Sequence, residues 1–359
     1  MTTATSSASS AAASSYYGTS PLIRTLRLGL GASERLWPTL GVRAAYRVFG
    51  TPLPPKWLNR SQGPDQHWRR EDWPYEHASI GVYTPVVVPI DAPQVLLVHG
   101  WGGHAGQLLP LAKAVAASGF TPVLVEMPAH GRSAGTVSNL PQFARAIDYV
   151  AARLIQQGET IKAVVAHSLG ANALAYAASR GLPVERLVLM APPASPHEFT
   201  RYFAQVFGLS ERTRAAMQRL IETREAILMP LLEPAAVGPR IAQRTLVVHD
   251  REDRVNRFED GVAFRDAIPG ARLVATQGLG HRRILKEAAV LQEVAAFIAQ
   301  PWSPHSAQRA ANAAFSGSSI LTSSTSRSSC FSRWTLMSSA LIDTYFEMTA
   351  ISSRCSSGR

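Results

Sequence analysis

The chain has 359 residues, a formal net charge of +11 and 46% hydrophobic residues, enough for a substantial core in one large domain or two smaller ones. Its two cysteines, Cys330 and Cys355, predict neither a disulfide framework nor a cysteine metal site, and the default location is the cytoplasm. We find no helix-turn-helix, zinc module, aromatic-interleaved basic patch or phosphate-binding glycine loop. We therefore expect no nucleic-acid partner and attribute the charge to dispersed, solvated side chains.

The first part of the chain differs from the rest in composition. Residues 1–20 contain 16 Ser, Thr or Ala residues and no charge, which predicts a disordered leader, with an organelle transit peptide as the alternative. Residues 21–78 predict a basic N-terminal helical segment with spaced apolar residues such as Leu26, Trp37 and Phe49. We expect this segment to pack as a brace against the following domain, and a weak contact with a membrane surface stays open.

From residue 78 onward, short apolar runs alternate with helix-like stretches. Residues 78–90 are suited to leading antiparallel strands, whereas the later runs are almost continuously apolar, as buried parallel strands are. These later runs are residues 95–98, 121–125, 161–165, 187–191, 245–248 and 273–276. The alternation predicts an α/β fold with a mostly parallel central sheet flanked by helices.

A serine lies between one of these runs and the helix-like stretch that follows it. Ser168 comes after residues 161–165 and before residues 171–179, which predicts a strand, a sharp turn with the serine at its apex, and a helix. Strand and helix backbones nearly touch at such a turn, so the residues two before and two after the serine must be small. Here they are Ala166 and Gly170. A buried serine in an ordinary strand-to-helix turn is the competing interpretation.

A nucleophilic serine also needs two donors for the oxyanion. The apolar run 95–98 leads into His99 and a glycine-rich turn around Trp101, which can aim the backbone N–H of Trp101 at an acyl oxygen. The backbone N–H of Leu169, directly after the serine, is the second candidate donor. The Trp101 indole is better suited to a pocket wall.

The same chemistry needs a general base and an acid that orients it. The strand predicted at residues 245–248 delivers two candidate acids, Asp250 and Asp253, to its carboxyl end. The strand predicted at residues 273–276 is followed by a loop that carries His281, the candidate base. The chain order of serine, acid and histidine is the one found in folds that carry such a strand-turn-helix serine.

Together these motifs resemble the serine-nucleophile branch of the α/β-hydrolase superfamily over residues 79–300. Within it, the segment around the candidate base is similar to that of small bacterial hydrolases of undefined substrate. The spacing in the superfamily favours Asp253 over Asp250 as the acid. The resemblance implies Ser168 as nucleophile, Asp253 as acid, His281 as general base, and Trp101 and Leu169 as oxyanion-hole donors.

Two further regions complete the expected organisation. Residues at about 195–239 form a helical insertion, which the resemblance identifies as a cap over the pocket. Its aromatic residues at helical spacing, Phe199, Phe203 and Phe207 among them, either wall an acyl site or pack the cap onto the core. Residues 301–359 are Ser-rich and predict a disordered C-terminal extension, to which we assign no function.

The resulting hypothesis is a serine hydrolase that cleaves an ester or thioester of a small to medium acyl group through an acyl-enzyme intermediate. The reaction requires no cofactor and no metal, and the expected partner is the small-molecule acyl substrate. An acyltransferase with the same three residues is one alternative. A binding or scaffold protein that has the fold but no turnover is the other.

Overall fold

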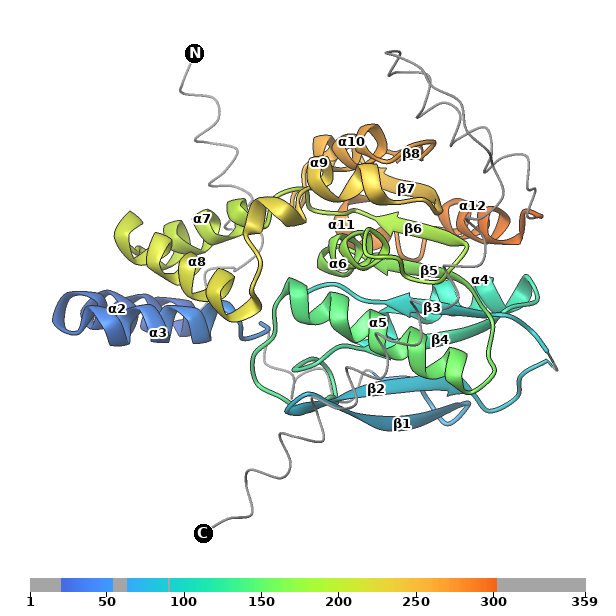
Figure 1. Cartoon of the computed structure of the whole chain (residues 1–359), viewed down its shortest axis with the longest axis horizontal. Helices are drawn as coiled ribbons and strands as arrows, with labels where there is room; N and C mark the ends of the chain where they lie inside the picture. Colours follow the sequence, from blue (N-terminus) through green and yellow to red (C-terminus); the bar gives the residue numbers. More distant parts are fainter. Residues whose placement is uncertain (1–20, 54–62, 90, 302–359) are drawn as a thin grey trace, which may run out of the picture. The chain divides into compact units, whose positions relative to one another are not determined.

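The computed structural model describes residues 21–53, 63–89 and 91–301. The predictions for the leader at residues 1–20 and for the extension beyond residue 301 therefore lie outside the described residues. Figure 1 shows a central sheet with helices on both faces and a separate group of helices to one side.

Within the described residues the sheet has eight strands, in the order β1-β2-β4-β3-β5-β6-β7-β8. The pairs β1–β2 and β2–β4 are antiparallel, and all other neighbours are parallel, as the sequence predicts. The parallel strands are short and buried because helices cover both of their faces. The strands are β1 (Trp68–Tyr75), β2 (Ala78–Pro85), β3 (Gln94–Val98), β4 (Thr121–Glu126), β5 (Ile161–His167), β6 (Arg186–Met190), β7 (Arg244–Asp250) and β8 (Arg272–Thr276).

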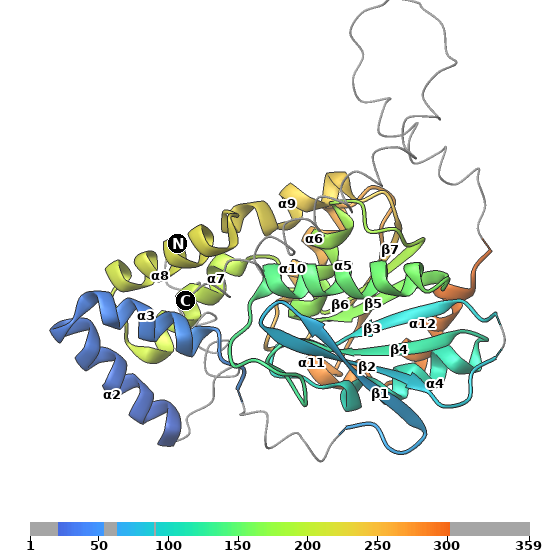
Figure 2. The ribbon, with the colours of Figure 1, turned by 60° about the horizontal axis from the view of Figure 1, so that its bottom comes forward.

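Two hydrophobic clusters hold the helices on the sheet. On one face, α5 (Leu140–Gln156), α6 (Leu169–Ala178), α9 (Pro234–Val237) and α10 (Phe258–Ala267) bury residues such as Phe143, Leu174 and Phe264. On the other face, α4 (Leu109–Ala117) and α12 (Ala288–Ala299) bury residues such as Leu111 and Val294. Figure 2 shows α5 in front of the sheet and α12 behind it. The short elements η2 (Ala105–Leu108), η4 (Gly238–Arg240) and α11 (Gly280–Arg283) lie in the connections.

The predicted cap insertion lies between β6 and β7. It consists of α7 (Pro196–Phe207), α8 (Glu211–Glu225) and η3 (Met229–Leu232). Gly208, in the left-handed conformation, ends α7, and the Ser210 side chain accepts a hydrogen bond from the Thr213 N–H to begin α8. These two signals place a sharp turn between the cap helices.

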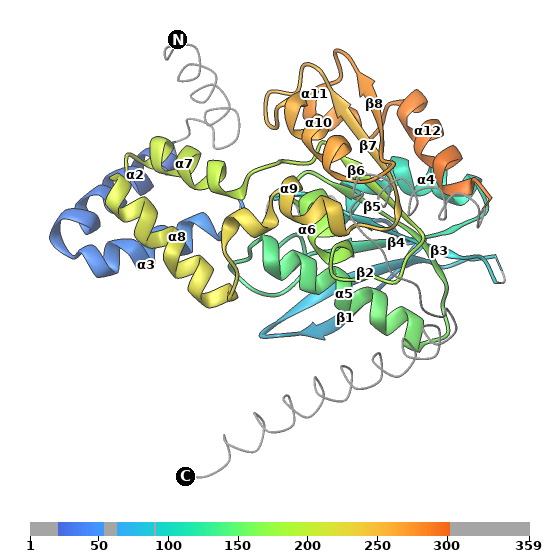
Figure 3. The ribbon, with the colours of Figure 1, turned by 45° about the horizontal axis from the view of Figure 1, so that its top comes forward.

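The N-terminal helices α2 (Pro21–Leu36) and α3 (Pro38–Phe49) pack on this cap. Figures 1 and 3 both show α2 and α3 beside α7 and α8, away from the sheet. Ile23 and Leu30 of α2 share a buried cluster with Phe203 and Phe207 of α7, and Glu34 accepts a hydrogen bond from the Ser210 N–H at 3.2 Å. The expected brace therefore packs against the cap.

The predicted boundary at residues 78 and 79 is wrong, because β1 begins at Trp68 and belongs to the sheet. Of the described residues between 21 and 78, only those as far as Phe49 are helical. The charged run from Arg69 to Asp72 concealed the strand: β1 is an edge strand that buries only Trp73 and Tyr75 and leaves its charged residues largely in solvent.

The helices α2 and α3 and the residue between them, Trp37, expose large apolar side chains. Leu28 is 77% exposed, Leu36 64%, Trp37 60% and Leu40 53%. Exposed arginines such as Arg24 lie on the same two helices. In the described part of the chain, no helix is both long and apolar enough to cross a membrane. A weak contact of this face with a membrane surface remains a prediction.

Candidate functional site

Ser168 occupies a strained turn between β5 and α6. Its φ and ψ angles are 55° and −126°, in a left-handed region that residues other than glycine rarely adopt. The Ser168 N–H donates to the Met190 carbonyl oxygen at 2.8 Å, which ties the turn to the neighbouring strand β6. The surrounding fold thus holds the serine at the apex of the predicted strand-turn-helix unit.

Two glycines allow other backbone segments to approach this turn. A Cβ atom on Gly170 would lie 2.5 Å from the carbonyl oxygen of His99, so α6 starts directly against the end of β3. A Cβ atom on Gly100 would lie 2.6 Å from Ser168 Cβ. The predicted need for a small residue at position 170 is confirmed, and the sequence did not reveal the same need at position 100.

A hydrogen-bonded chain of three side chains starts at Ser168. His281 Nε2 lies 3.0 Å from Ser168 Oγ, and His281 Nδ1 lies 2.7 Å from Asp253 Oδ2. The three residues come from the ends of β5 and β7 and from α11, which follows β8. Because the carboxylate can only accept, it assigns the proton to His281 Nδ1 and leaves Nε2 free to take a proton from the hydroxyl.

Asp250, the competing acid, has other partners. Its carboxylate accepts hydrogen bonds from Thr276 Oγ1 at 2.7 Å, from the Leu279 N–H at 3.0 Å and from the Glu252 N–H at 2.9 Å. Burial raises the pKa of Asp250, but these bonds and one from the Gly280 N–H outweigh it and lower the pKa below its usual value. Asp250 therefore fastens the loop after β8 to the end of β7.

The Asp253 side chain is fully buried and accepts hydrogen bonds at both oxygens. Oδ1 accepts from the Val255 N–H at 2.7 Å and the Asn256 N–H at 3.0 Å, and Oδ2 lies 3.5 Å from His249 Nε2 as well as facing His281. Burial alone would raise the pKa of Asp253, but the two histidines and the backbone donors hold it well below its usual range. The ionised carboxylate can thus stabilise a protonated imidazole.

The sequence analysis did not single out His249 and Asn256, which both lie at this site. Asn256 Nδ2 donates to the Ala191 carbonyl oxygen at 2.7 Å and lies 3.5 Å from Ser168 Oγ. His249 Nε2 lies 3.2 Å from the carbonyl oxygen of Asn256, and both side chains are buried. Their only sequence signal is proximity to Asp253, which ordinary strand and turn residues share.

The two predicted oxyanion donors approach Ser168 from different elements. Leu169 is the first residue of α6, where backbone N–H groups have no acceptor within the helix. Trp101 follows Gly100, which packs directly against Ser168, in the turn after β3. Both N–H groups thus belong to segments that border the serine, and the Trp101 indole lines a cavity, as expected.

Two buried histidines next to these segments are neutral at pH 7. Burial lowers the pKa of His99 to about 4 and that of His167 to about 3. His99 Nε2 accepts from the Met127 N–H at 3.1 Å, so its Nδ1 donates to the Gly100 carbonyl oxygen at 2.7 Å and steadies the turn before Trp101. His167 Nε2 lies 2.9 Å from the carbonyl oxygen of His281 and supports the predicted base.

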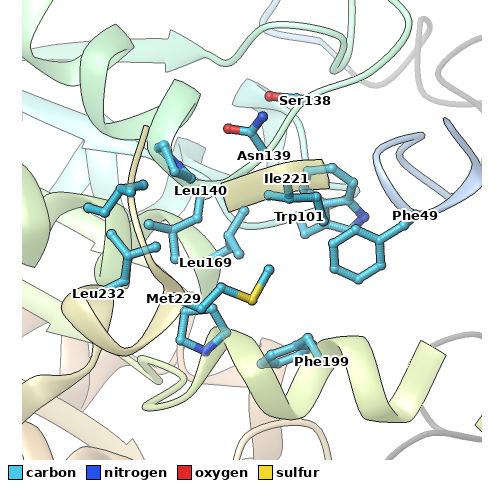
Figure 4. Close-up of a pocket in the computed structure, with 13 residues that line it drawn as sticks. Phe49, Trp101, Ser138, Asn139, Leu140, Leu169, Phe199, Ile221, Met229 and Leu232 are labelled. Carbon is cyan, nitrogen blue, oxygen red and sulfur yellow. The ribbon is translucent and has the colours of Figure 1, made fainter. Parts of the chain in front are cut away.

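Two cavities adjoin the site and share Trp101 as a wall. The first, which we call the apolar pocket, lies under the cap and has a volume of about 70 Å³. Figure 4 shows its labelled side chains converging from the cap, from α3 and from the loops of the sheet. They include Phe49, Trp101, Leu169, Phe199, Ile221 and Met229. The aromatic residues of the cap that the sequence places at helical spacing therefore have two roles. Phe199 faces this pocket, whereas Phe203 and Phe207 pack on the N-terminal helices.

The second cavity, which we call the basic pocket, has a volume of about 340 Å³ and contains Ser168 and His281. The glycine-rich turn after β3 forms one side, and Arg282 and Lys286 lie on another. Among the residues that the structure describes, no group of three or more His, Cys, Asp or Glu side chains is placed to hold a metal ion.

Comparisons with known proteins agree with this architecture. Residues 91–237 match the model of a family described as serine aminopeptidase, S33, and residues 230–330 match that of a family described as TAP-like protein. A crystal structure of a putative lipase from Acinetobacter baumannii AYE is 14% identical, with a TM-score of 0.50, over 67% of this chain and 93% of the lipase. The structure of Est1E from Butyrivibrio proteoclasticus with ferulic acid is 16% identical, with a TM-score of 0.49, over 64% and 96%. The comparison with curated proteins finds no match.

The mostly parallel sheet with a cap between β6 and β7, the two matching family models and the similar fold of the putative lipase identify the class of protein. The chain belongs to the α/β-hydrolase superfamily. Within that superfamily the chain is a hydrolase, and the geometry of its site is the basis for proposing which bond it cleaves.

Proposed function

We propose that the chain is a serine hydrolase that cleaves an ester or thioester of a small to medium acyl group. The observation that carries the proposal is the hydrogen-bonded chain from Ser168 through His281 to Asp253, with distances of 3.0 and 2.7 Å. A serine in a left-handed turn, a base within reach of its hydroxyl and an ionised carboxylate behind the base are what nucleophilic catalysis by serine needs.

The reaction follows from the proton positions. His281 Nε2 takes the Ser168 hydroxyl proton as Oγ attacks the acyl carbon, and Asp253 stabilises the resulting imidazolium. The acyl oxygen gains negative charge and accepts hydrogen bonds from the backbone N–H groups of Trp101 and Leu169. His281 then donates the proton to the leaving alcohol or thiol, and water, activated by the same imidazole, releases the acyl group from Ser168.

The lining of the apolar pocket supports a substrate whose acyl group is apolar. Leu169 and Trp101, which carry the proposed oxyanion donors, also line this pocket. An acyl chain that places its oxygen between these donors can therefore extend directly into the space between Phe199 and Met229. The narrow volume of about 70 Å³ favours slender chains of limited length.

Fluorophosphonate labelling of the full chain tests the nucleophile. We expect covalent labelling and hydrolysis of p-nitrophenyl butyrate by the unaltered chain, and loss of both in Ser168→Ala, with a fall in kcat of several orders of magnitude. Ser179→Ala, at the other end of α6, is the matched control and should leave both unchanged. Labelling that persists in Ser168→Ala would refute the assignment.

The same preparation separates the two alternatives. A chain that is labelled, but that releases its acyl group only when an alcohol or thiol acceptor is added, is an acyltransferase. A folded chain that is neither labelled nor active on any ester of the series is a binding or scaffold protein.

A further inference from the structure

The basic pocket differs in character from the apolar pocket, with which it shares Trp101 as a wall. Its described lining contains two cations, Arg282 and Lys286, and no Asp or Glu. The rest of the lining includes four glycines of the turn after β3 and the following η2, together with the side-chain amide of Gln107. The pocket therefore offers positive charge and room next to the nucleophile.

The two cations are available to a ligand. Arg282 and Lys286 are both exposed, and neither has an ion pair or a side-chain hydrogen bond among the described residues. Arg283, between them in sequence, differs because its guanidinium donates to the Leu279 carbonyl oxygen at 2.9 Å and so holds the loop. Two like charges on one wall repel each other unless an anion lies between them.

We propose that the basic pocket binds a phosphate group carried by the alcohol or thiol portion of the substrate. This inference rests on the proposed function, in which Ser168 forms an acyl-enzyme and the leaving group departs on the side of His281. The apolar pocket accommodates the acyl chain, so the basic pocket is left for the leaving group. A phosphate monoester carries a charge of about −2 at neutral pH, which matches the two cations, and guanidinium binds phosphate oxygens in pairs.

Matched thioesters of one acyl group test the proposal with the full chain. The probes are hexanoyl coenzyme A, which carries phosphates on the thiol side, and hexanoyl N-acetylcysteamine, which is neutral. We expect kcat/KM to be at least about tenfold higher for the phosphate-bearing thioester, because its KM is lower. This preference should decline as added salt screens the charges. A ratio near one at low ionic strength would overturn the proposal.

Charge-removing variants locate the effect. Arg282→Gln combined with Lys286→Gln should reduce the ratio of the two kcat/KM values by about tenfold. Lys113→Gln, which removes an exposed cation from α4, is the matched control and should leave the ratio unchanged. A double variant with an unaltered ratio would show that the phosphate does not bind at these two residues.

Two further measurements show which portion of the substrate carries the anion, and whether a negative result concerns this inference or the proposed function. A preference for a monosuccinyl over a butyryl ester of the same neutral alcohol would assign the anion to the acyl group and so contradict the proposal. Turnover of the neutral thioester without a preference refutes only this inference. An absence of fluorophosphonate labelling together with no turnover of either thioester refutes the proposed function.

Discussion

Replacing the two competing acids one at a time distinguishes catalysis from loop structure. In Asp253→Asn the amide oxygen can keep the bonds from the Val255 and Asn256 N–H groups, at 2.7 and 3.0 Å in the native chain. The amide nitrogen then faces His281 Nδ1, which must accept instead of donate. The imidazole proton moves to Nε2, so the ring cannot take the proton of Ser168.

The expected loss follows from this tautomer change. In the serine-protease template the same substitution lowers kcat by roughly 10⁴, which corresponds to about 5 kcal/mol of transition-state stabilisation. We expect a similar loss in Asp253→Asn, measured as kcat on p-nitrophenyl butyrate at a temperature where circular dichroism shows a folded chain. Asp253→Asn with more than about a tenth of the native kcat would refute the role of Asp253 as the orienting acid.

Asp250→Asn is the matched control, and the structure predicts a different defect. Four donors converge on the Asp250 carboxylate, from Thr276 Oγ1 and from the N–H groups of Glu252, Leu279 and Gly280, and an amide nitrogen would oppose at least one of them. We expect a loss of about 1–3 kcal/mol in the free energy of unfolding. The fall in kcat should be far smaller than in Asp253→Asn, since His281 keeps its partner. The reverse order of kcat losses would assign the acid to Asp250.

Four other predictions concern the parts around the site. Gly170→Ala should lower Tm by about 5 °C or more, because its Cβ would lie 2.5 Å from a carbonyl oxygen of β3's end. Burial raises the pKa of Asp260 to about 6, so the charged carboxylate lowers the free energy of unfolding above that pH. In urea unfolding at pH 8, Asp260→Asn should therefore be more stable than the native chain. This advantage should shrink from pH 6 toward pH 4, as the native carboxyl becomes protonated. Phe49→Ala enlarges the apolar pocket and should raise the ratio of kcat/KM on p-nitrophenyl decanoate to that on the butyrate by about tenfold. Leu28→Gln with Trp37→Gln should weaken sedimentation with phosphatidylglycerol vesicles by about tenfold, if the exposed face of α2 and α3 contacts membranes.

Three of these predictions have a matched control variant, and the prediction for Phe49→Ala is judged on the kcat/KM ratio alone. Gly29→Ala, on open space in α2, should leave Tm unchanged, and an equal loss in both glycine variants would remove the steric reason. Asp266→Asn, whose side chain is 60% exposed, should show no stabilisation. If the ratio of kcat/KM on the decanoate to that on the butyrate is unaltered in Phe49→Ala, Phe49 does not line the acyl site. Leu231→Gln, an exposed residue of η3, should not change vesicle binding, and equal binding by all variants would exclude the N-terminal face.

The parallel part of the fold was predictable because its signals are local. A strand buried on both faces must be apolar almost throughout, so β3 and β5 are visible as short runs in the sequence. The elbow at Ser168 is visible for a similar reason, since close backbone approach requires a residue as small as Gly170. The carboxyl ends of parallel strands lie at one edge of the sheet, which brings Asp253 toward the serine.

Features that depend on distant contacts were not predictable. Four of the eight residues of β1 are charged, and its pairing with β2 keeps it extended. The different roles of Asp250 and Asp253 depend on where the loop after β8 folds back, more than twenty residues later in the chain. His249 and Asn256 became recognisable only once the position of Ser168 was known.

The N-terminal helices change what counts as the cap. Phe49 of α3 contacts Phe203 of α7 edge to face, with ring centroids 5.3 Å apart, and the same Phe49 lines the apolar pocket. Phe203 and Phe207 are completely buried, and their cover includes α2 and α3. Without residues 21–53 the cap insertion would expose two aromatic rings, and the pocket would lose a wall. Exposing this much apolar surface to water would strongly destabilise the cap. The apolar pocket is therefore built partly from a helix that precedes the sheet and partly from the insertion between β6 and β7. If this pocket holds the acyl group, as we propose, changes in the N-terminal helices should alter acyl selectivity without touching Ser168, His281 or Asp253.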